Sequence, residues 1–443
     1  MTVGALVRSR AGTSCVFVMA AAAAWGGPVA AQEPGAVADS VGLGEALELA
    51  LIVSPALAQS TASLSQADGS RRMAWGSFLP NVNLSSGASV QSSSQFDPGT
   101  QRVVSGSSDS YNAGLSANYQ IFQGGRRFNE LDRSSAGILE AEARLEDQRF
   151  SVLLQTRTFF MNALRQDELV RVAEGSVSRA EESLDITRRR VQVGTGTRSD
   201  SLRTRLELAN ARQALLQARN QLRASRFALG RQIGADGPVV PLPPGNLDPA
   251  PLALREVELV ELAQSVSPAV RAAEAAASVA DASVGSARAS YLPNINLSSG
   301  YTWANNQASF DGGNTSWNFR LSGSYPLFNG FQREEQVSQA SESRRVARLQ
   351  EEDARRGVRQ DVDAALRTLE TQEQAIEIAR EAVAVAEEDL RLNRERYRVG
   401  VATILDVITS QVALDQAEAD LVSARYDYVL AKAELESIVG REL

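Results

Sequence analysis

The sequence predicts a mainly α-helical chain with a small β part, and three observations support this fold class. Closely similar segments recur in the two halves of the 443-residue chain. Residues 126–192 and 331–399 contain no proline and are rich in good helix formers. Each of these stretches follows a pair of short segments in which apolar and polar residues alternate, as in half-buried strands. We therefore expect a duplicated unit with one strand pair and long helices in each copy.

Residues 1–31 are predicted to be a secretory signal peptide. Arg8 and Arg10 give it a basic start, residues 15–25 form its apolar core, and the small residues ending at Ala31 provide a cleavage site. The sequence GGP ends the apolar run abruptly, which argues against the alternative of a buried N-terminal helix. No later run is long and apolar enough to predict a transmembrane helix.

The composition argues against several classes of function. The chain contains no histidine, and Cys15, its one cysteine, lies in the predicted signal peptide. The commonest general base and metal ligands are therefore missing. The sequence also lacks a nucleophile–base pair, a phosphate loop and metal-ligand spacing, so we expect no enzyme, no catalytic residue, no metal site and no cofactor. A formal net charge of −8 disfavours nucleic acid as a partner.

The mature chain is predicted to be an internal duplication. The segment SFLPNVNLSSG from Ser77 returns as SYLPNINLSSG from Ser290, and RRRVQVG returns as RERYRVG 206 residues later. These pairs place the first repeat at 42–234 and the second at 255–440. The proline-rich residues 235–254 between them are predicted to be a linker, since proline disfavours helix interiors and central strands.

Each repeat is predicted to contain one amphipathic strand pair, at about 81–90 and 113–122 and at about 294–303 and 317–327. Strands of this length with one apolar face are typical of membrane barrels, although a soluble sheet with one wet face has the same pattern. Trp303 lies near the loop end, where an interfacial aromatic belongs. The predicted membrane-facing residues are Tyr119, Tyr301, Trp303, Trp317, Phe319 and Tyr325.

The rest of each repeat is predicted to be helical. The expected long helices and their returning partners cover residues 126–192 and 200–233, and residues 331–399 and 405–438. At a rise of about 1.5 Å per residue, each long helix extends about 100 Å, which requires coiled-coil packing. A further helix is expected to begin at each Ser-Pro pair, at Pro55 and Pro268, because serine caps a helix and proline suits its first turn.

Four strands cannot close a membrane barrel, for which about eight is the practical minimum. Either the sheet lies outside a membrane, or several chains each contribute four strands. Three chains would share a 12-stranded β-barrel, and their long antiparallel helical hairpins would form an α-barrel in the trimer.

With these features, the whole mature chain resembles the outer membrane efflux proteins, the TolC family. The most specific segments are the hairpin tips RVQVGTGTRSD and RYRVGVATILDV, together with ARYDYVLAKAEL from Ala424. The resemblance implies a homotrimeric channel-tunnel in the cell outer membrane, in contact with its lipid, with a long periplasmic extension. It also implies a passive exit duct of a tripartite efflux pump or type I secretion system. The implied partners are a periplasmic adaptor (membrane fusion) protein and an inner-membrane pump.

The resemblance assigns adaptor contact to the two helix tips. The residues at the tips are Val193, Gly194, Thr195, Val399, Gly400 and Val401. Glycine suits a helix reversal because it adopts positive φ without a Cβ clash.

The resemblance also assigns a periplasmic mouth, or gate. Asp406 matches an aspartate that lines the mouth, where three copies would favour cations, although a solvated helix carboxylate is the alternative. Thr409 stands where the family has a second aspartate, and Ala402 stands where it has a latching arginine. Asp200 matches the partner of that arginine, and Tyr397 keeps the aromatic latch position. We therefore expect a weaker charge ring and a differently fastened gate.

A second hypothesis is a periplasmic coiled-coil adaptor or scaffold protein without a pore. Adaptors usually combine one helical hairpin with a compact β-domain, whereas this chain has two hairpins and two strand pairs. The adaptor hypothesis predicts a protein that is soluble without detergent.

Overall fold

The structure is a computed structural model that describes residues 40–441 apart from 98, 100, 244, 246–248, 250–254 and 310. The predicted signal peptide, residues 1–31, lies outside the described residues. In the described part, no single helix is long and apolar enough to cross a membrane. The helices α1 (Leu43–Val53) and α2 (Pro55–Gly76), bent by 51° at their junction, meet that length and composition criterion only as a pair.

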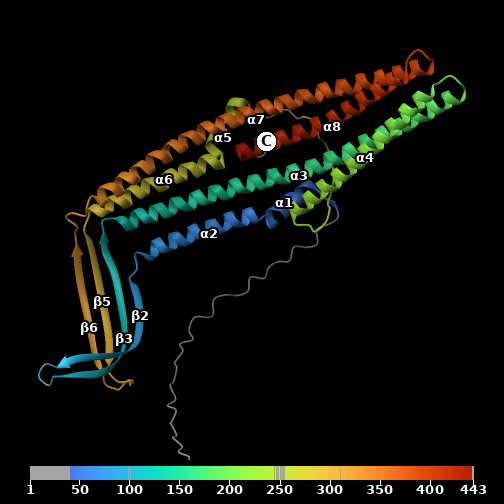
Figure 1. The fold of residues 1–443 in the computed structure, drawn as a ribbon. Coiled ribbons are helices and arrows are strands. Elements are labelled where there is room, and N and C mark those ends of the chain that lie inside the picture. Colours follow the sequence, from blue (N-terminus) through green and yellow to red (C-terminus); the bar gives the residue numbers. More distant parts are fainter. Residues whose placement is uncertain are drawn as a thin grey trace, which may run out of the picture. The chain divides into compact units, whose positions relative to one another are not determined.

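The same series of elements occurs twice along the described unit (Figure 1). After α1 and α2, the first series has β2 (Asn81–Asp97), β3 (Arg102–Gln123), α3 (Arg126–Gln192) and α4 (Arg198–Ile233). The second series has α5 (Glu256–Val266), α6 (Pro268–Arg288), β5 (Asn294–Asn305), β6 (Asn314–Ser324), α7 (Gln332–Arg398) and α8 (Ile404–Val439). The long helices α3 and α7 have 67 residues each, and the returning helices α4 and α8 have 36 each.

The helix predictions are confirmed. The bounds of α3 coincide with the predicted 126–192, because glycine turns flank a stretch without proline. Both Ser-Pro pairs begin a helix, and Ser54 caps α2 by accepting a hydrogen bond of 3.3 Å from the N–H of Leu57. Ser267 precedes Pro268 in the same way but makes no side-chain cap bond.

The four long strands form one antiparallel sheet in the order β2-β3-β5-β6, with one apolar and one polar face. One row of cross-strand neighbours on the apolar face consists of Leu84, Leu115, Tyr301 and Trp317. The next row, on the opposite face, consists of Ser85, Gly114, Thr302 and Ser316. The alternation read from the sequence therefore runs in register across all four strands, up to a register shift between Gln120 and Phe122 of β3.

The strand ends differ from the predictions. β2 and β3 continue to Asp97 and from Arg102, well past the predicted ends near 90 and 113. Their serine-rich extension has little strand preference, but continuous pairing satisfies its backbone groups. β6 ends at Ser324 rather than near 327, because Pro326 has no N–H for the ladder. Arg333 instead binds this segment by donating to the carbonyl oxygen of Pro326 at 3.0 Å.

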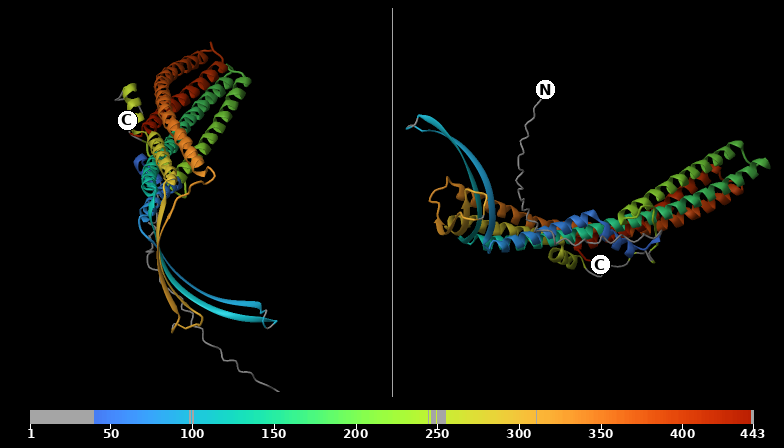
Figure 2. Two further views of the ribbon diagram at one scale, coloured as in Figure 1. Left: turned by 90° about the vertical axis from the view of Figure 1, so that its left-hand side faces the viewer. Right: turned by 90° about the horizontal axis from the view of Figure 1, so that it is seen from below.

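The helices follow the lateral order of the strands (Figures 1 and 2). Near the sheet, α6 packs between α7 and α3, and α2 packs on the other side of α3. Toward the tips, α8 takes the place of α6 and α4 takes the place of α2. The layer is therefore four helices wide, in the order α7, α6 or α8, α3, and α2 or α4.

Part of the predicted linker is ordered. β1 (Ser40–Val41) pairs in parallel with β4 (Val240–Pro241), and the N–H of Leu242 donates to the carbonyl oxygen of Val41 at 2.9 Å. Val239 is buried and hydrogen-bonds to the backbone of Arg226 in α4. This stretch of the linker is therefore fixed against the first repeat.

We expect Gly230→Ala to destabilise the chain. A Cβ there would lie 2.1 Å from the carbonyl oxygen of Gly237, so the linker backbone would have to move. We expect a loss of about 1–3 kcal/mol of unfolding free energy. Denaturant unfolding followed by circular dichroism measures this change. Gly357→Ala in α7 is the control, because nothing lies within 4 Å of its Cβ position, and it should stabilise slightly. Equal shifts for the two variants would contradict this account.

Candidate functional site

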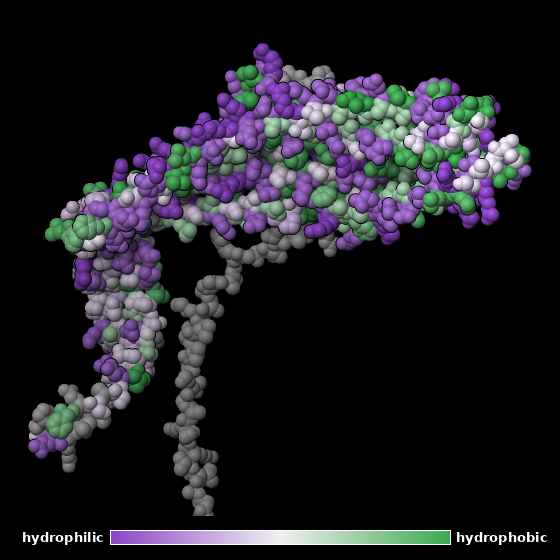
Figure 3. Space-filling view, turned by 45° about the horizontal axis from the view of Figure 1, so that its top comes forward, coloured by the Kyte–Doolittle hydropathy of each residue, from purple (hydrophilic) through white to green (hydrophobic). Residues whose placement is uncertain are grey.

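Both helical hairpins end in an exposed tip of the same construction. Val193 ends α3 and Val399 ends α7, and both side chains are exposed. The following residues, Gly194 and Gly400, have φ values of 77° and 86°, which a Cβ would strain. Apolar side chains lie among the hydrophilic ones at the end of the helices that carries the tips (Figure 3). The predicted contact residues at the tips therefore lie where a partner can reach them.

The returning helices begin with matching capping boxes. Thr197 and Asp200 at the start of α4 exchange backbone–side chain hydrogen bonds of 3.2 Å and 3.1 Å. Thr403 and Asp406 do the same at the start of α8, with bonds of 3.3 Å and 2.7 Å. Asp200 and Asp406 therefore share a structural role that stabilises the first turn of each returning helix.

The hydrogen bonds at Asp406 also keep its carboxylate charged. The Thr403 backbone N–H and then the Thr403 hydroxyl lower the pKa of Asp406 below its ordinary value of 3.8. The carboxylate is exposed, and Thr409, one turn further along α8, is exposed as well. Asp406 thus presents a fixed negative charge to solvent near the second tip.

Arg190 of α3 joins the first hairpin to the second, in a contact that we call the tip clip. Its guanidinium lies 4.5 Å from the centre of the Tyr397 ring and donates to the backbone carbonyl oxygens of Tyr397 and Arg398. These carbonyls lie at the C-terminal end of α7, where the helix dipole favours a cation. The tip clip therefore combines a cation–π contact with charge-assisted hydrogen bonds.

Tyr397 is itself fixed by apolar packing. It is buried in a cluster with Leu390, Ile404 and Val407, and Ala402 packs at the edge of this cluster. In the described part of the chain the Tyr397 hydroxyl has no hydrogen-bond partner. Tyr397 is therefore held through the face of its ring, and Ala402 contributes packing at the edge of the cluster.

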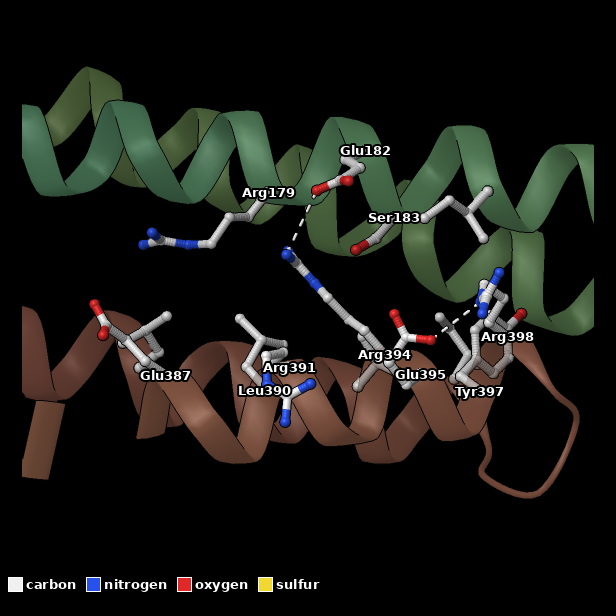
Figure 4. A pocket seen from close by; sticks show the side chains of 14 residues that line it. Arg179, Glu182, Ser183, Glu387, Leu390, Arg391, Arg394, Glu395, Tyr397 and Arg398 are labelled. Carbon is white, nitrogen blue, oxygen red and sulfur yellow. Dashed lines mark hydrogen bonds and ion pairs between the residues drawn. The ribbon is translucent and has the colours of Figure 1, made fainter. Parts of the chain in front are cut away.

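A cavity of about 520 Å³ lies beside the tip clip, between α3 and the α7–α8 hairpin (Figure 4). Arg394 extends from α7 toward Glu182 of α3, and their charged atoms are 3.5 Å apart. The apolar side of the cavity is formed by Leu390, Ile404, Val407 and Leu414. The two hairpins are therefore separated here by a partly open space, which the ion pair between Arg394 and Glu182 crosses.

Further from the tips, α3 and α8 meet in a row of charged pairs, which we call the internal seam. Arg179 binds Asp415 at 2.5 Å and Glu418 at 2.7 Å. Arg165 binds Asp427 at 3.0 Å. These side chains are partly buried, so solvent ions screen the pairs less than fully exposed ones. The internal seam holds the two hairpins of one chain side by side.

The predicted membrane-facing residues lie in two kinds of place. Tyr301, Trp317 and Phe319 are exposed on the apolar face of the sheet, and the register places Tyr119 and Trp303 on the same face. These two also make contacts within the chain, whereas Tyr325 lies outside the strands. Trp303 donates from its ring N–H to the carbonyl oxygen of Gly312 at 3.3 Å, Tyr119 has Arg127 5.0 Å from its ring centre, and Tyr325 lies past the end of β6.

Sequence reasoning missed two features of the site. The capping boxes could have been found, because the segments TRSD and TILD have threonine and aspartate at the required spacing. No sequence signal pointed to the tip clip, since Arg190 and Tyr397 are 207 residues apart. In the described residues, no group of three histidine, cysteine, aspartate or glutamate side chains is placed to hold a metal ion.

Comparison with known proteins finds relatives of similar sequence and solved structures of similar fold. The protein CyaE of Bordetella pertussis is 29% identical over 458 residues, which cover 99% of this chain and 90% of that protein. The alkaline protease secretion protein AprF of Pseudomonas aeruginosa is 25% identical over 75% of this chain and 70% of its own length. The crystal structure of the CmeC outer membrane channel of Campylobacter jejuni shares the fold, with a TM-score of 0.78 at 18% identity, over 90% of this chain and 85% of that one.

The family model described as outer membrane efflux protein matches residues 46–235 and 259–441, one match in each half of the chain. These matches give no support to the hypothesis of an adaptor or scaffold without a pore. Together with the sheet, the paired hairpins and their tips, they show that this chain belongs to the outer membrane efflux protein family.

Proposed function

We propose that three copies of this chain form a passive exit duct that carries substrates across the periplasm and the outer membrane. The duct serves a tripartite efflux pump or a type I secretion system. A periplasmic adaptor contacts the tips at Val193–Thr195 and Val399–Val401, and an inner-membrane pump supplies the energy. The protein acts in transport and performs no catalysis.

The four-stranded sheet is the observation that carries this proposal. Its apolar face presents large exposed side chains, including Leu84, Trp317, Phe319 and Leu321. Such a surface suits the acyl chains of outer membrane lipid rather than water. Among the described residues, its outer strands, β2 and β6, each have a free edge. A membrane does not tolerate open sheet edges. Further copies that close the sheet into a barrel pair these edges and place the apolar face against lipid.

The number of copies follows from the strand count. Two copies give eight strands, which side chains fill, whereas three give twelve and leave room for a passage. The polar face, with Ser85, Thr302 and Ser316 in one row, then lines the interior.

Channel conductance tests the proposal. Protein purified in detergent and added to planar bilayers should give discrete conductance steps, and its native mass should equal three chains. A monomer that stays soluble without detergent and gives no conductance would support the adaptor hypothesis instead.

We expect Asp406→Asn to weaken block of the channel by divalent cations. Three Asp406 carboxylates would form a ring near the axis, and asparagine removes the charge while keeping an oxygen for the Thr403 N–H. Block should weaken about tenfold or more, measured as the blocking concentration in bilayers. Asp200→Asn is the matched control, because it changes the equivalent capping box of the first hairpin. Equal effects of both variants would overturn the assignment of Asp406.

The same block should persist from pH 7 to pH 5. Because the pKa of Asp406 is lowered in the folded chain, its carboxylate stays charged above the ordinary value of 3.8. The stabilising effect of this carboxylate is present above that value and is lost only as the pH falls through the lower folded-state pKa. Bilayer measurements at the two pH values check this, and a block that disappears by pH 5 would contradict it.

We expect Arg190→Ala to raise the open fraction of the channel. Loss of the tip clip removes about 1–2 kcal/mol of stabilising free energy between the hairpins. This corresponds to roughly a fivefold to thirtyfold change in the ratio of open to closed channels. Arg189→Ala is the control, because Arg189 pairs within α3, with Asp185, and its side chain is 77% exposed. Tyr397→Phe should change little, since the hydroxyl has no partner in the described chain. An Arg189 effect as large as that of Arg190 would remove the case for the clip.

A further inference from the structure

The cavity beside the tip clip has the properties of a small-molecule site. Its volume of about 520 Å³ lies within the usual range of about 300–1,000 Å³ for such sites. One wall is apolar and belongs to a buried cluster, with Leu390, Ile404, Val407 and Leu414. Charged side chains of α3 and α7 line the other walls (Figure 4). An apolar wall with a few convergent polar groups is the usual construction of a ligand pocket.

Arg394 has donors that the chain does not use. Its side chain extends from α7 into the space between α7 and α3 (Figure 4). In the described part of the chain its ion pair with Glu182 is 3.5 Å long, and its Nη2 has no hydrogen-bond partner. The Glu182 side chain is 60% exposed, so its carboxylate can turn to solvent. Because a guanidinium has five N–H donors, Arg394 can bind a further anion.

The unused polar atoms on the cavity walls are donors. Among the described lining residues, the buried side-chain atoms without a partner are Nη2 of Arg394, Nε of Arg179 and the hydroxyl of Tyr397. No carboxylate oxygen of the lining is in this position. The exposed Glu387 also lines the cavity, but it lies two turns of α7, about 10 Å, from Arg394. The lining therefore suits a ligand that accepts hydrogen bonds.

We propose that the cavity binds an amphipathic organic anion, a small molecule with one carboxylate and an apolar ring or chain. The carboxylate replaces Glu182 as the partner of Arg394. The apolar part packs against the wall that contains Leu390, Val407 and Leu414. A charge-assisted hydrogen bond at one end and apolar contact at the other fix the orientation of such a ligand.

A molecule bound here contacts both hairpins of one chain. Ser183 and Ile186 of α3 line one side of the cavity. Leu390 of α7 and Val407 of α8 line the other side. The tip clip joins the same two hairpins, so a ligand that contacts both sides favours the joined state over a separated one. This consequence rests on the proposed duct and its gate, whereas binding itself does not.

Binding of cinnamate to the full-length protein in detergent tests the site. Calorimetric titration should show one cinnamate bound per chain. Cinnamyl alcohol and cinnamylammonium have the same apolar body without charge and with the opposite charge, and both should bind at least tenfold more weakly. Titration of empty micelles provides the background from partition into detergent. Equal or tighter binding of cinnamylammonium would overturn the proposal, because the carboxylates would then define the site.

Two variants separate a binding role of Arg394 from a structural one. Arg394→Gln and Glu182→Gln both remove the ion pair between α7 and α3. Arg394→Gln also removes the cation that binds the carboxylate, so cinnamate should bind at least tenfold more weakly. Glu182→Gln removes the competing carboxylate, so cinnamate should bind about threefold more tightly. Similar losses of affinity in both variants would show that the pair only supports the cavity, and would overturn the site.

Filling the cavity is a further test. Ile186 lines the cavity and is 37% exposed, so Ile186→Trp can be accommodated and should weaken cinnamate binding at least tenfold. Ile378→Trp in α7 is the matched control, because Ile378 is 68% exposed and does not line the cavity. Thermal unfolding checks that both variants fold. Unchanged binding by Ile186→Trp would place the ligand elsewhere and overturn the proposal.

Conductance separates this site from the proposed function. Saturating cinnamate should lower the open fraction of single channels at least fivefold, and the Arg394→Gln channel should need at least tenfold more cinnamate for the same effect. Cinnamate binding without this effect would overturn the link to the gate. Discrete channels in a protein that binds no cinnamate would overturn the site and leave the duct intact. Absence of both channels and the three-chain mass would overturn the proposed function itself.

Discussion

Each strand of the sheet continues into, or comes from, a helix at the same lateral position. The strands of the sheet and the helices packed beyond it therefore follow the same lateral order. Hydrogen bonds fix the order β2-β3-β5-β6, and this order places α2, α3, α6 and α7 in turn. Because α6 and α8 succeed one another along the same line, as α2 and α4 do, the order extends unchanged to the tips. The positions of Arg190 and Tyr397 at the tips therefore depend on strand pairing at the far end of the helices. A slip of strand register would displace the strands and the helices connected to them together.

Duplication preserved this framework while the two copies diverged in side-chain chemistry. The two hairpins share lengths, glycine turns and capping boxes, and all of these depend on local backbone geometry. Contacts that depend on side chains differ. In the second hairpin, Ser410 hydrogen-bonds to Asp389 and Asn393, whereas the corresponding residues of the first hairpin are Thr204, Ser183 and Thr187. Each hairpin can thus acquire its own internal contacts without disturbing the fold.

The sequence was most informative where local rules decide the structure. Residues 126–192 form one helix because nothing in that stretch interrupts it, and Pro55 and Pro268 begin helices as expected. Local rules failed where pairing overrides preference, as in the serine-rich ends of β2 and β3. They also failed for the end of β6, predicted near 327, because Pro326 ends the ladder first. The resemblance suggested residues for a mouth, but it could not reveal that Arg190 approaches Tyr397, since that contact depends on how two hairpins pack.

The chemical nature of the tip clip limits what can release it. The clip joins the Arg190 guanidinium to a ring face and to two backbone carbonyl oxygens, and no carboxylate takes part in it. In the proposed assembly, an adaptor bound at the tips acts where Val399 and Gly400 adjoin the carbonyls that Arg190 binds. A partner that binds only the released form pays for that release with part of its affinity, about tenfold for each 1.4 kcal/mol. Weak docking of an isolated partner to tips held by the clip is then an expected property of the proposed gate.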